Sequence, residues 1–164
     1  SQGKESSAFE FIDLIKKLGN LYPNTVGYIG HSMGGLVLMN ILSEGIDLHK
    51  SIVINSPTQG NYVMDSFLNI LGASQNTSYF IKQYIKNKLN RNYDDLFQPL
   101  VLEELSGKTL VIHDKKDKQV GIETIASTKE ILPLATYEFT EGFGHVRILF
   151  EQKIADRCLE WIEK

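Results

Sequence analysis

Cysteine is almost absent from this chain of 164 residues, in which Cys158 is the single example. One cysteine cannot form an internal disulfide, so nothing in the sequence requires an oxidising compartment, and we expect a cytoplasmic protein. Apolar residues recur at helical spacing around Cys158, which favours a thiol packed within a helix interface over a reactive one. We therefore predict no chemical role for it.

Long apolar runs and an excess of one charge are also missing. No stretch is apolar enough to span a bilayer, and residues 1–7 are polar with no hydrophobic segment of the signal-peptide type behind them. Lys and Arg number 17 against 20 Asp and Glu, giving a net charge of −3. This balance gives no electrostatic reason to expect nucleic acid or an anionic membrane surface as a partner, and it leaves small neutral or mildly polar substrates open.

The sequence also has no initiator methionine, no internal repeat and no low-complexity tract. Hydrophobic residues make up 42% of it and charged residues 23%, an ordinary globular balance that is enough to close one core. We expect a single domain over residues 1–164, in a processed or truncated product of a longer chain.

Helical and strand patterns alternate along the sequence. Residues 7–18 predict an amphipathic helix, which Ser6 or Ser7 caps and Gly19 ends, and residues 25–29 predict a buried strand. The elements that follow are a helix over 34–42, a strand over 51–54, a strand over 109–112, a helix over 122–132, a strand over 135–139 and a helix over about 150–162. Such alternation implies an α/β fold, with a parallel sheet flanked by helices.

A G-x-S-x-G motif occupies residues 30–34, where a predicted strand ends and a predicted helix begins. A serine hydroxyl is a poor nucleophile unless it is exposed, deprotonated by a base and aimed at a carbonyl, and a tight strand-to-helix turn exposes Ser32 in this way. The turn strains the serine backbone and brings strand and helix close together, so we expect that only small residues fit at Gly30 and Gly34, with Gly35 relieving the same crowding.

The helix that follows the motif directs free backbone N–H groups toward its N-terminus. The amide of Met33 is therefore a candidate oxyanion donor. A phosphate-binding glycine loop is the other interpretation of the motif, but the sequence lacks the lysine and the longer glycine spacing which that loop requires.

With this motif the sequence resembles the α/β-hydrolase superfamily, over the C-terminal part of that fold. The resemblance implies the order serine, acid, histidine, with the acid after a later strand and the histidine in the loop after the last strand. Residues 110–120 (LVIHDKKDKQV) resemble the family's strand followed by His-Gly-x-x-Asp-x-x-Val, which makes Asp117 the acid. Asp114 stands where many relatives have glycine and stays a rival acid, and Gly121 stands where many have proline.

Residues 141–145 (EGFGH) resemble the family's final Gly-His, which makes His145 the general base. The other histidines have weaker claims. We expect His31 to pack or hydrogen-bond near the nucleophile, His49 to be a turn residue and His113 a strand-end residue. No histidine has a partner at metal-ligand spacing, so we predict no metal site, and the implied chemistry needs no cofactor.

Residues 58–108 form a segment too long for a plain crossover between two strands. It contains amphipathic stretches around 62–71 and 78–89, whose apolar residues include Tyr62, Phe67, Tyr79, Phe80 and Tyr84. Two interpretations stay open: helices that pack on the sheet, or a helical lid insertion over the active site.

The resemblance also implies what precedes the motif in the family: several strands and a unit that supplies a second oxyanion donor. Losing one donor typically costs about a hundredfold in rate. The first strand would become an exposed edge with an uncovered apolar flank, which favours self-association or pairing with the missing N-terminal half.

The resemblance implies a serine hydrolase that cleaves carboxylic esters of small molecules through an acyl-enzyme, similar to esterases and lysophospholipases. Hydrolysis of thioesters, amides or carbon–carbon bonds uses the same residues and stays open. A haloalkane dehalogenase is disfavoured because it needs a carboxylate at position 32. The alternative to an enzyme is a catalytically incompetent fragment or a non-enzymatic binding module of the same fold.

Overall fold

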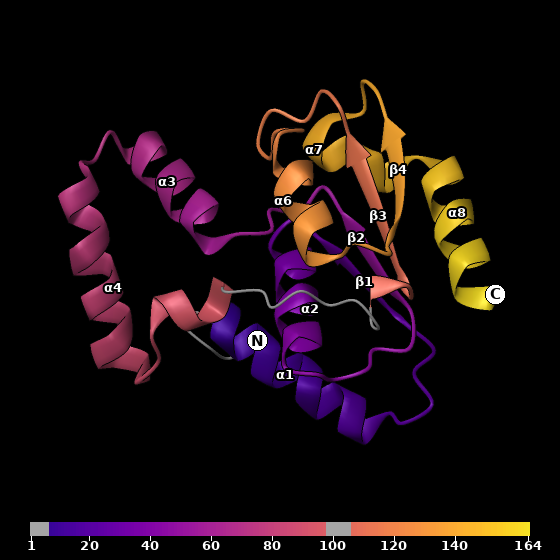
Figure 1. Cartoon of the computed structure of the whole chain (residues 1–164), viewed down its shortest axis with the longest axis horizontal. Coiled ribbons are helices and arrows are strands. Elements are labelled where there is room, and N and C mark those ends of the chain that lie inside the picture. Colours follow the sequence, from indigo (N-terminus) through magenta and orange to yellow (C-terminus); the bar gives the residue numbers. More distant parts are fainter. Residues whose placement is uncertain (1–6, 98–105) are drawn as a thin grey trace.

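The computed structural model of the protein describes residues 7–97 and 106–164. The helices and strands, labelled in Figure 1, are α1 (Ala8–Leu21), β1 (Tyr28–His31), α2 (Met33–Ser43), β2 (Ser51–Ile54), α3 (Gly60–Leu71), α4 (Gln75–Leu89), β3 (Thr109–Asp114), α6 (Thr124–Ile131), β4 (Thr136–Thr140), α7 (Gly144–Arg147) and α8 (Gln152–Glu163). Two short 3-10 helices lie at Tyr93–Phe97 and Ile148–Phe150.

The strands form one sheet in the order β1-β2-β3-β4, and each neighbouring pair is parallel. Each connection crosses back over a face of the sheet before the next strand begins, which makes neighbouring strands parallel. The carboxyl ends of all four strands therefore meet at one edge. The predicted α/β class, with a parallel sheet flanked by helices, is confirmed.

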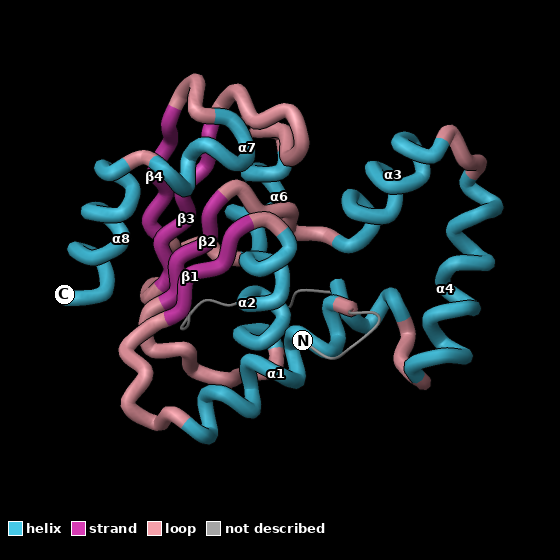
Figure 2. Tube along the Cα trace, turned by 180° about the vertical axis from the view of Figure 1, so that it is seen from behind, coloured by secondary structure: helices cyan, strands magenta, loops and turns pink. Residues whose placement is uncertain are grey.

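Helices cover both faces of the sheet, as Figure 2 shows from behind. Every residue of β2 and β3 is buried, which explains the apolar runs of residues 52–54 and 110–112. On one face Val53 and Val111 join a core built from α1, α2 and α6. On the other, Ile52, Ile54, Leu110 and Ile112 pack against Ile148, Ile154 and Cys158 from the C-terminal helices.

The first helix begins as predicted and ends later. Ser7 caps it through a reciprocal pair of hydrogen bonds with Glu10, while Ser6 lies outside the described residues. The expected end at Gly19 is wrong, because α1 continues to Leu21. Pro23 provides the physical reason: the residue before a proline is pushed out of the helical region, and Tyr22 adopts φ −123° and ψ 70°.

The strand after α1 also differs from the prediction, since it begins at Tyr28 and runs through the start of the G-x-S-x-G motif to His31. It is an edge strand on which no described strand pairs from the outer side. Val26 and Ile29 are 64% and 53% exposed there. In the part of the chain that the structure describes, β1 therefore forms the exposed apolar edge that the sequence predicted.

The segment between β2 and β3 forms the two predicted helices, α3 and α4, which project to one side of the sheet in both views (Figures 1 and 2). Met64 and Leu68 of α3 pack with Tyr93 in a small separate cluster. No residue of α4 is buried, and the aromatic side chains of Phe67, Tyr79, Phe80 and Tyr84 are exposed. Val63 of α3 and Ile85 and Leu89 of α4 are nevertheless partly buried against the core that α1 and α2 share with the sheet. Residues 98–105 of the predicted insertion lie outside the described residues.

None of the helices in the described ranges is long and apolar enough to cross a membrane.

Candidate active site

Ser32 occupies a strained turn between β1 and α2. Its backbone has φ 54° and ψ −122°, a positive φ that non-glycine residues rarely adopt. Two hydrogen bonds from β2 and the residues after it hold this conformation: the Ser32 amide donates to the Ile54 carbonyl at 3.0 Å, and the Ser56 hydroxyl donates to the Ser32 carbonyl at 2.8 Å. The turn thus presents the serine side chain at the carboxyl end of the sheet.

The glycines of the motif differ in what they allow. A Cβ at Gly30 would lie 2.6 Å from backbone atoms of Gly34 and Gly35, and one at Gly35 would lie 2.7 Å from the Ser56 side chain. Crowding therefore requires both glycines. The same expectation is wrong for Gly34, where a Cβ would meet no described atom within 4 Å, because this face of α2 borders an apolar cavity of about 250 Å³ beside the open edge of β1.

The three residues predicted as a catalytic set lie in one hydrogen-bonded chain. Nε2 of His145 lies 3.0 Å from Oγ of Ser32, and Nδ1 of His145 lies 2.7 Å from Oδ2 of Asp117. A carboxylate only accepts, so Nδ1 carries the proton and Nε2 is left to accept the serine proton. The side chains of His145 and Asp117 are 8% and 0% exposed, which shields their interaction from water.

The loop after β3 fixes the Asp117 carboxylate. Its Oδ1 accepts hydrogen bonds from the amides of Gln119 at 2.8 Å and Val120 at 3.0 Å, which leaves Oδ2 for the histidine. Tyr62 at the start of α3 ties into the same loop, since its hydroxyl accepts from the Gly121 amide and donates to the Gln119 carbonyl.

Asp114 does not take the place of Asp117 beside the histidine. Its carboxylate instead accepts the hydroxyl of Thr140 and the amides of Lys116, Gly142 and Phe143. Burial raises the pKa of Asp114, but these hydrogen bonds outweigh it and hold the pKa at about 2. Asp114 is therefore an ionised carboxylate that binds backbone.

The other histidines lie as expected. His31 is the last residue of β1, and its Nε2 donates to the His145 carbonyl at 2.8 Å; burial lowers its pKa more than this hydrogen bond raises it. His113 near the end of β3 is fully buried and donates to the Val120 carbonyl, and burial lowers its pKa as well. His49 is a turn residue with φ 59°.

Asn55 is a residue of this region that the sequence did not single out. It is fully buried, has φ 43°, and its amide donates to the carbonyls of Gly144 and His145. The sequence signal that could have identified it is a polar Asn-Ser pair directly after a buried strand, at the sheet edge where the other polar site residues lie.

Met33 is the first residue of α2, so its amide has no intrahelical acceptor and lies beside Ser32. Cys158 is buried against β2 and β3, and burial raises the pKa of its thiol. Across residues 7–97 and 106–164, no group of three His, Cys, Asp or Glu side chains is placed to hold a metal ion.

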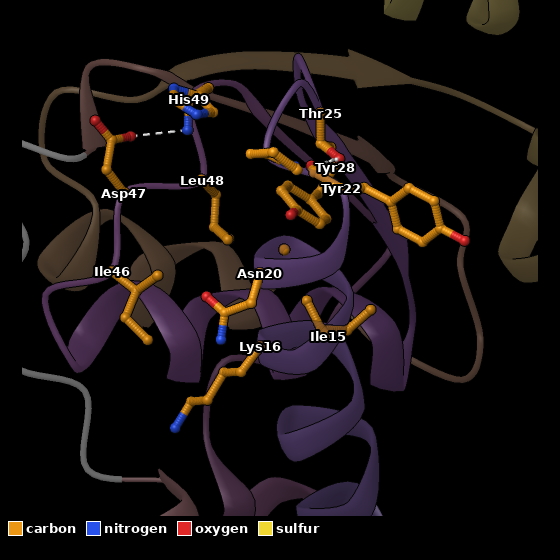
Figure 3. Close-up of a pocket in the computed structure, with 12 residues that line it drawn as sticks. Ile15, Lys16, Asn20, Tyr22, Thr25, Tyr28, Ile46, Asp47, Leu48 and His49 are labelled. Atoms are coloured by element: carbon orange, nitrogen blue, oxygen red, sulfur yellow. Dashed lines mark hydrogen bonds between the residues drawn. The ribbon is translucent and has the colours of Figure 1, made fainter.

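A separate cavity of about 390 Å³ lies at the opposite end of the sheet, between the end of α1 and the loop before β2 (Figure 3). Its charged side chains already have partners: Lys16 pairs with Glu44, and Asp47 with Lys108. The hydrogen-bonded set of Ser32, His145 and Asp117 lies at the other end of the sheet, at the carboxyl ends of the strands.

No protein-family model matches the sequence, and no curated protein matches it. Solved structures do match the fold. An esterase from Exiguobacterium antarcticum is 17% identical with a TM-score of 0.59, over 99% of this chain and 78% of its own. A bromoperoxidase from Bacillus anthracis is 17% identical with a TM-score of 0.61, over 100% and 77%. A meta-cleavage product hydrolase from Pseudomonas fluorescens is 15% identical with a TM-score of 0.58, over 99% and 74%. The sheet order, the strained serine turn and these likenesses together show that this chain has the α/β-hydrolase fold.

Proposed function

We propose that the protein is a serine hydrolase that cleaves carboxylic esters through an acyl-enzyme intermediate. The observation that carries this proposal is the pair of hydrogen bonds that links Ser32 to His145 and His145 to Asp117. The three groups come from separate loops, and a nucleophile, a base and an orienting acid in this arrangement are what acyl transfer requires.

In the first half of the reaction, Oγ of Ser32 attacks the acyl carbon while Nε2 of His145 takes the hydroxyl proton. Asp117 stabilises the imidazolium that results, and the Met33 amide donates to the oxyanion of the tetrahedral intermediate. The bond from the acyl carbon to the leaving oxygen then breaks, and Nε2 returns the proton to the departing alcohol.

In the second half, water attacks the acyl carbon and gives a proton to Nε2 of His145. The bond between the acyl carbon and Oγ of Ser32 breaks, the serine recovers its proton, and the carboxylic acid leaves. Every step uses side chains of this chain, with no cofactor and no redox partner.

Among the similar structures are an esterase and a meta-cleavage product hydrolase, so the fold accommodates more than one reaction. We propose the ester because an activated serine needs only a polarised acyl carbon and a good leaving group, which a small carboxylic ester supplies. Thioester, amide and carbon–carbon bonds are the alternatives that a substrate panel would separate.

We also propose that α3 and α4 act as a helical lid within one domain. Tyr62 connects the start of α3 to the loop that carries Asp117, and the exposed aromatic side chains of Phe67, Phe80 and Tyr84 offer an apolar surface to an acyl chain. Movement of the lid would then bear directly on the position of the acid.

Fluorophosphonate labelling with intact-mass detection tests the proposed function. We expect one adduct on the wild-type chain and none on Ser32→Ala or His145→Ala. Ser78→Ala, which removes an exposed hydroxyl on α4, is the matched serine control and should label like wild type. Folded wild-type protein that neither labels nor hydrolyses short p-nitrophenyl esters would reject the enzyme in favour of a catalytically incompetent fragment or a binding module.

A further inference from the structure

The Asp114 carboxylate lies at the end of β3, between the loop that carries Asp117 and the loop that carries His145. It is 0% exposed. Oδ1 accepts from the Lys116 amide at 3.0 Å and the Gly142 amide at 3.2 Å. Oδ2 accepts from the Phe143 amide at 3.0 Å and the Thr140 hydroxyl at 2.8 Å. One buried charge thus binds donors from both loops.

Asn55 completes the arrangement from the end of β2. Its Oδ1 accepts from the Asp114 amide at 2.8 Å, and its Nδ2 donates to the Gly144 carbonyl at 2.9 Å and the His145 carbonyl at 3.3 Å. The backbone amides of the histidine loop therefore bind Asp114, while the backbone carbonyls of the same loop bind Asn55.

The histidine loop needs support from outside itself. Gly142 and Gly144 adopt φ 95° and 69°, and a glycine has no side chain to favour one backbone conformation over others. A loop with two such residues directly before His145 is pliable on its own. Buried charge-assisted hydrogen bonds, each stronger than a neutral one, are suited to hold it.

We propose that Asp114 and Asn55 are positioning residues, which hold the loop before His145 so that its imidazole lies between Ser32 and Asp117; this inference rests on the proposed function. Neither residue touches the reacting atoms. The backbone of Asn55 is strained by its positive φ, and such strain usually persists only where neighbouring contacts compensate it.

The test compares Asp114→Asn with Glu141→Gln. Both changes remove one negative charge near the same loop, but Glu141 is exposed and pairs with Lys116 at the surface, whereas Asp114 binds the loop backbone. Asparagine keeps the shape of the aspartate. Its side-chain NH₂ group is a donor, however, and it would lie against N–H or O–H groups that now donate to the carboxylate. Each variant is labelled with fluorophosphonate to its end point, which gives the number of competent sites, and the rate per site is then measured between pH 5 and 9.

We expect Asp114→Asn to label about 10- to 100-fold more slowly per site, because a small misplacement of a reacting group costs a factor of this order. The factor lost should be similar at every pH, so the midpoint of the pH–rate profile should not change. Glu141→Gln should keep the wild-type labelling rate. A merely structural role would lower the number of competent sites and leave the rate per site unchanged, which would overturn the proposal. Equal losses in the two variants would also overturn it.

Two further measurements keep the proposal testable. If Asp114→Asn does not fold, Thr140→Val removes one donor to the same carboxylate and should lower the rate per site by a smaller factor; a wild-type rate there would overturn the proposal. If wild-type protein does not label, the proposed function has failed, and hydrogen exchange of residues 141–147 decides alone. Faster exchange in Asp114→Asn than in Glu141→Gln would support the positioning contacts, and equal exchange would reject them.

Discussion

Replacement of Gly30 by alanine should destabilise the fold through one steric contact. The new Cβ would lie 2.6 Å from the carbonyl carbon and oxygen of Gly34 and from the amide nitrogen of Gly35, all of them backbone atoms that no rotamer change can move. Strand β1 and helix α2 would have to separate by several tenths of an ångström. Forcing a methyl group into a closely packed site typically costs about 1–3 kcal/mol, and a rigid backbone neighbour places this case near the upper end.

Gly34→Ala is the matched control, four residues away in the same motif. Its Cβ would meet no described atom within 4 Å, and the residue lies in α2, where alanine exceeds glycine in helix propensity by about 0.8–1.0 kcal/mol. Urea unfolding followed by circular dichroism should show a lower midpoint for Gly30→Ala and an equal or higher midpoint for Gly34→Ala. Similar midpoints for the two variants would refute the steric account of this turn.

Three other predictions follow from the site. Asp117→Asn should lower ester turnover by about 10⁴-fold with little change in KM, since the tautomer of His145 is then no longer fixed; steady-state kinetics checks this, and a loss below tenfold would contradict it. The pKa of Asp114, about 2 against an ordinary 3.8, means that its ionised form stabilises the fold by about 2 kcal/mol above pH 4 and that this stability is lost as the pH falls from about 4 through 2. Urea midpoints between pH 2 and 5 should therefore fall more steeply for wild type than for Asp114→Asn, and parallel curves would speak against it. Ser56→Ala should cost about 1 kcal/mol and slow labelling of Ser32, whereas Ser43→Ala, which loses a hydroxyl-to-carbonyl bond on the outside of α2, should leave labelling unchanged.

Much of the fold is predictable because local sequence and tertiary environment agree. The strands β2 and β3 are buried on both faces, and their sequences contain the short apolar runs that are typical of such strands. The prediction of helix α1 was wrong only at its end, because Pro23 rather than Gly19 ends the helix. The four-residue helix α7 could not be predicted, because so short a helix has no periodicity and depends on contacts with distant residues.

The positions of Ser32, Asp117 and His145 came from motif order and family resemblance, and their mutual distances are a property of the sheet. Parallel strands in sequential order bring the three following loops to one edge, whatever the lengths of the intervening segments. Asn55 and Asp114 show the limit of such reasoning. Both side chains bind backbone groups that lie 28 to 90 residues away in sequence, and backbone groups leave no pattern in side-chain types.

Two residues with a strained backbone lie in the candidate active site. Of the four described non-glycine residues with positive φ, His49 and Asn90 belong to a turn and a helix end, whereas Ser32 and Asn55 follow adjacent strands of the sheet. The residues at the end of β2 act on both sides of the site. Ile54 and Ser56 hydrogen-bond to the Ser32 backbone, and Asn55 hydrogen-bonds to the loop of His145. The end of β2 therefore supports both Ser32 and the loop of His145, and a displacement of that strand end would move both partners of the Ser32–His145 hydrogen bond at once.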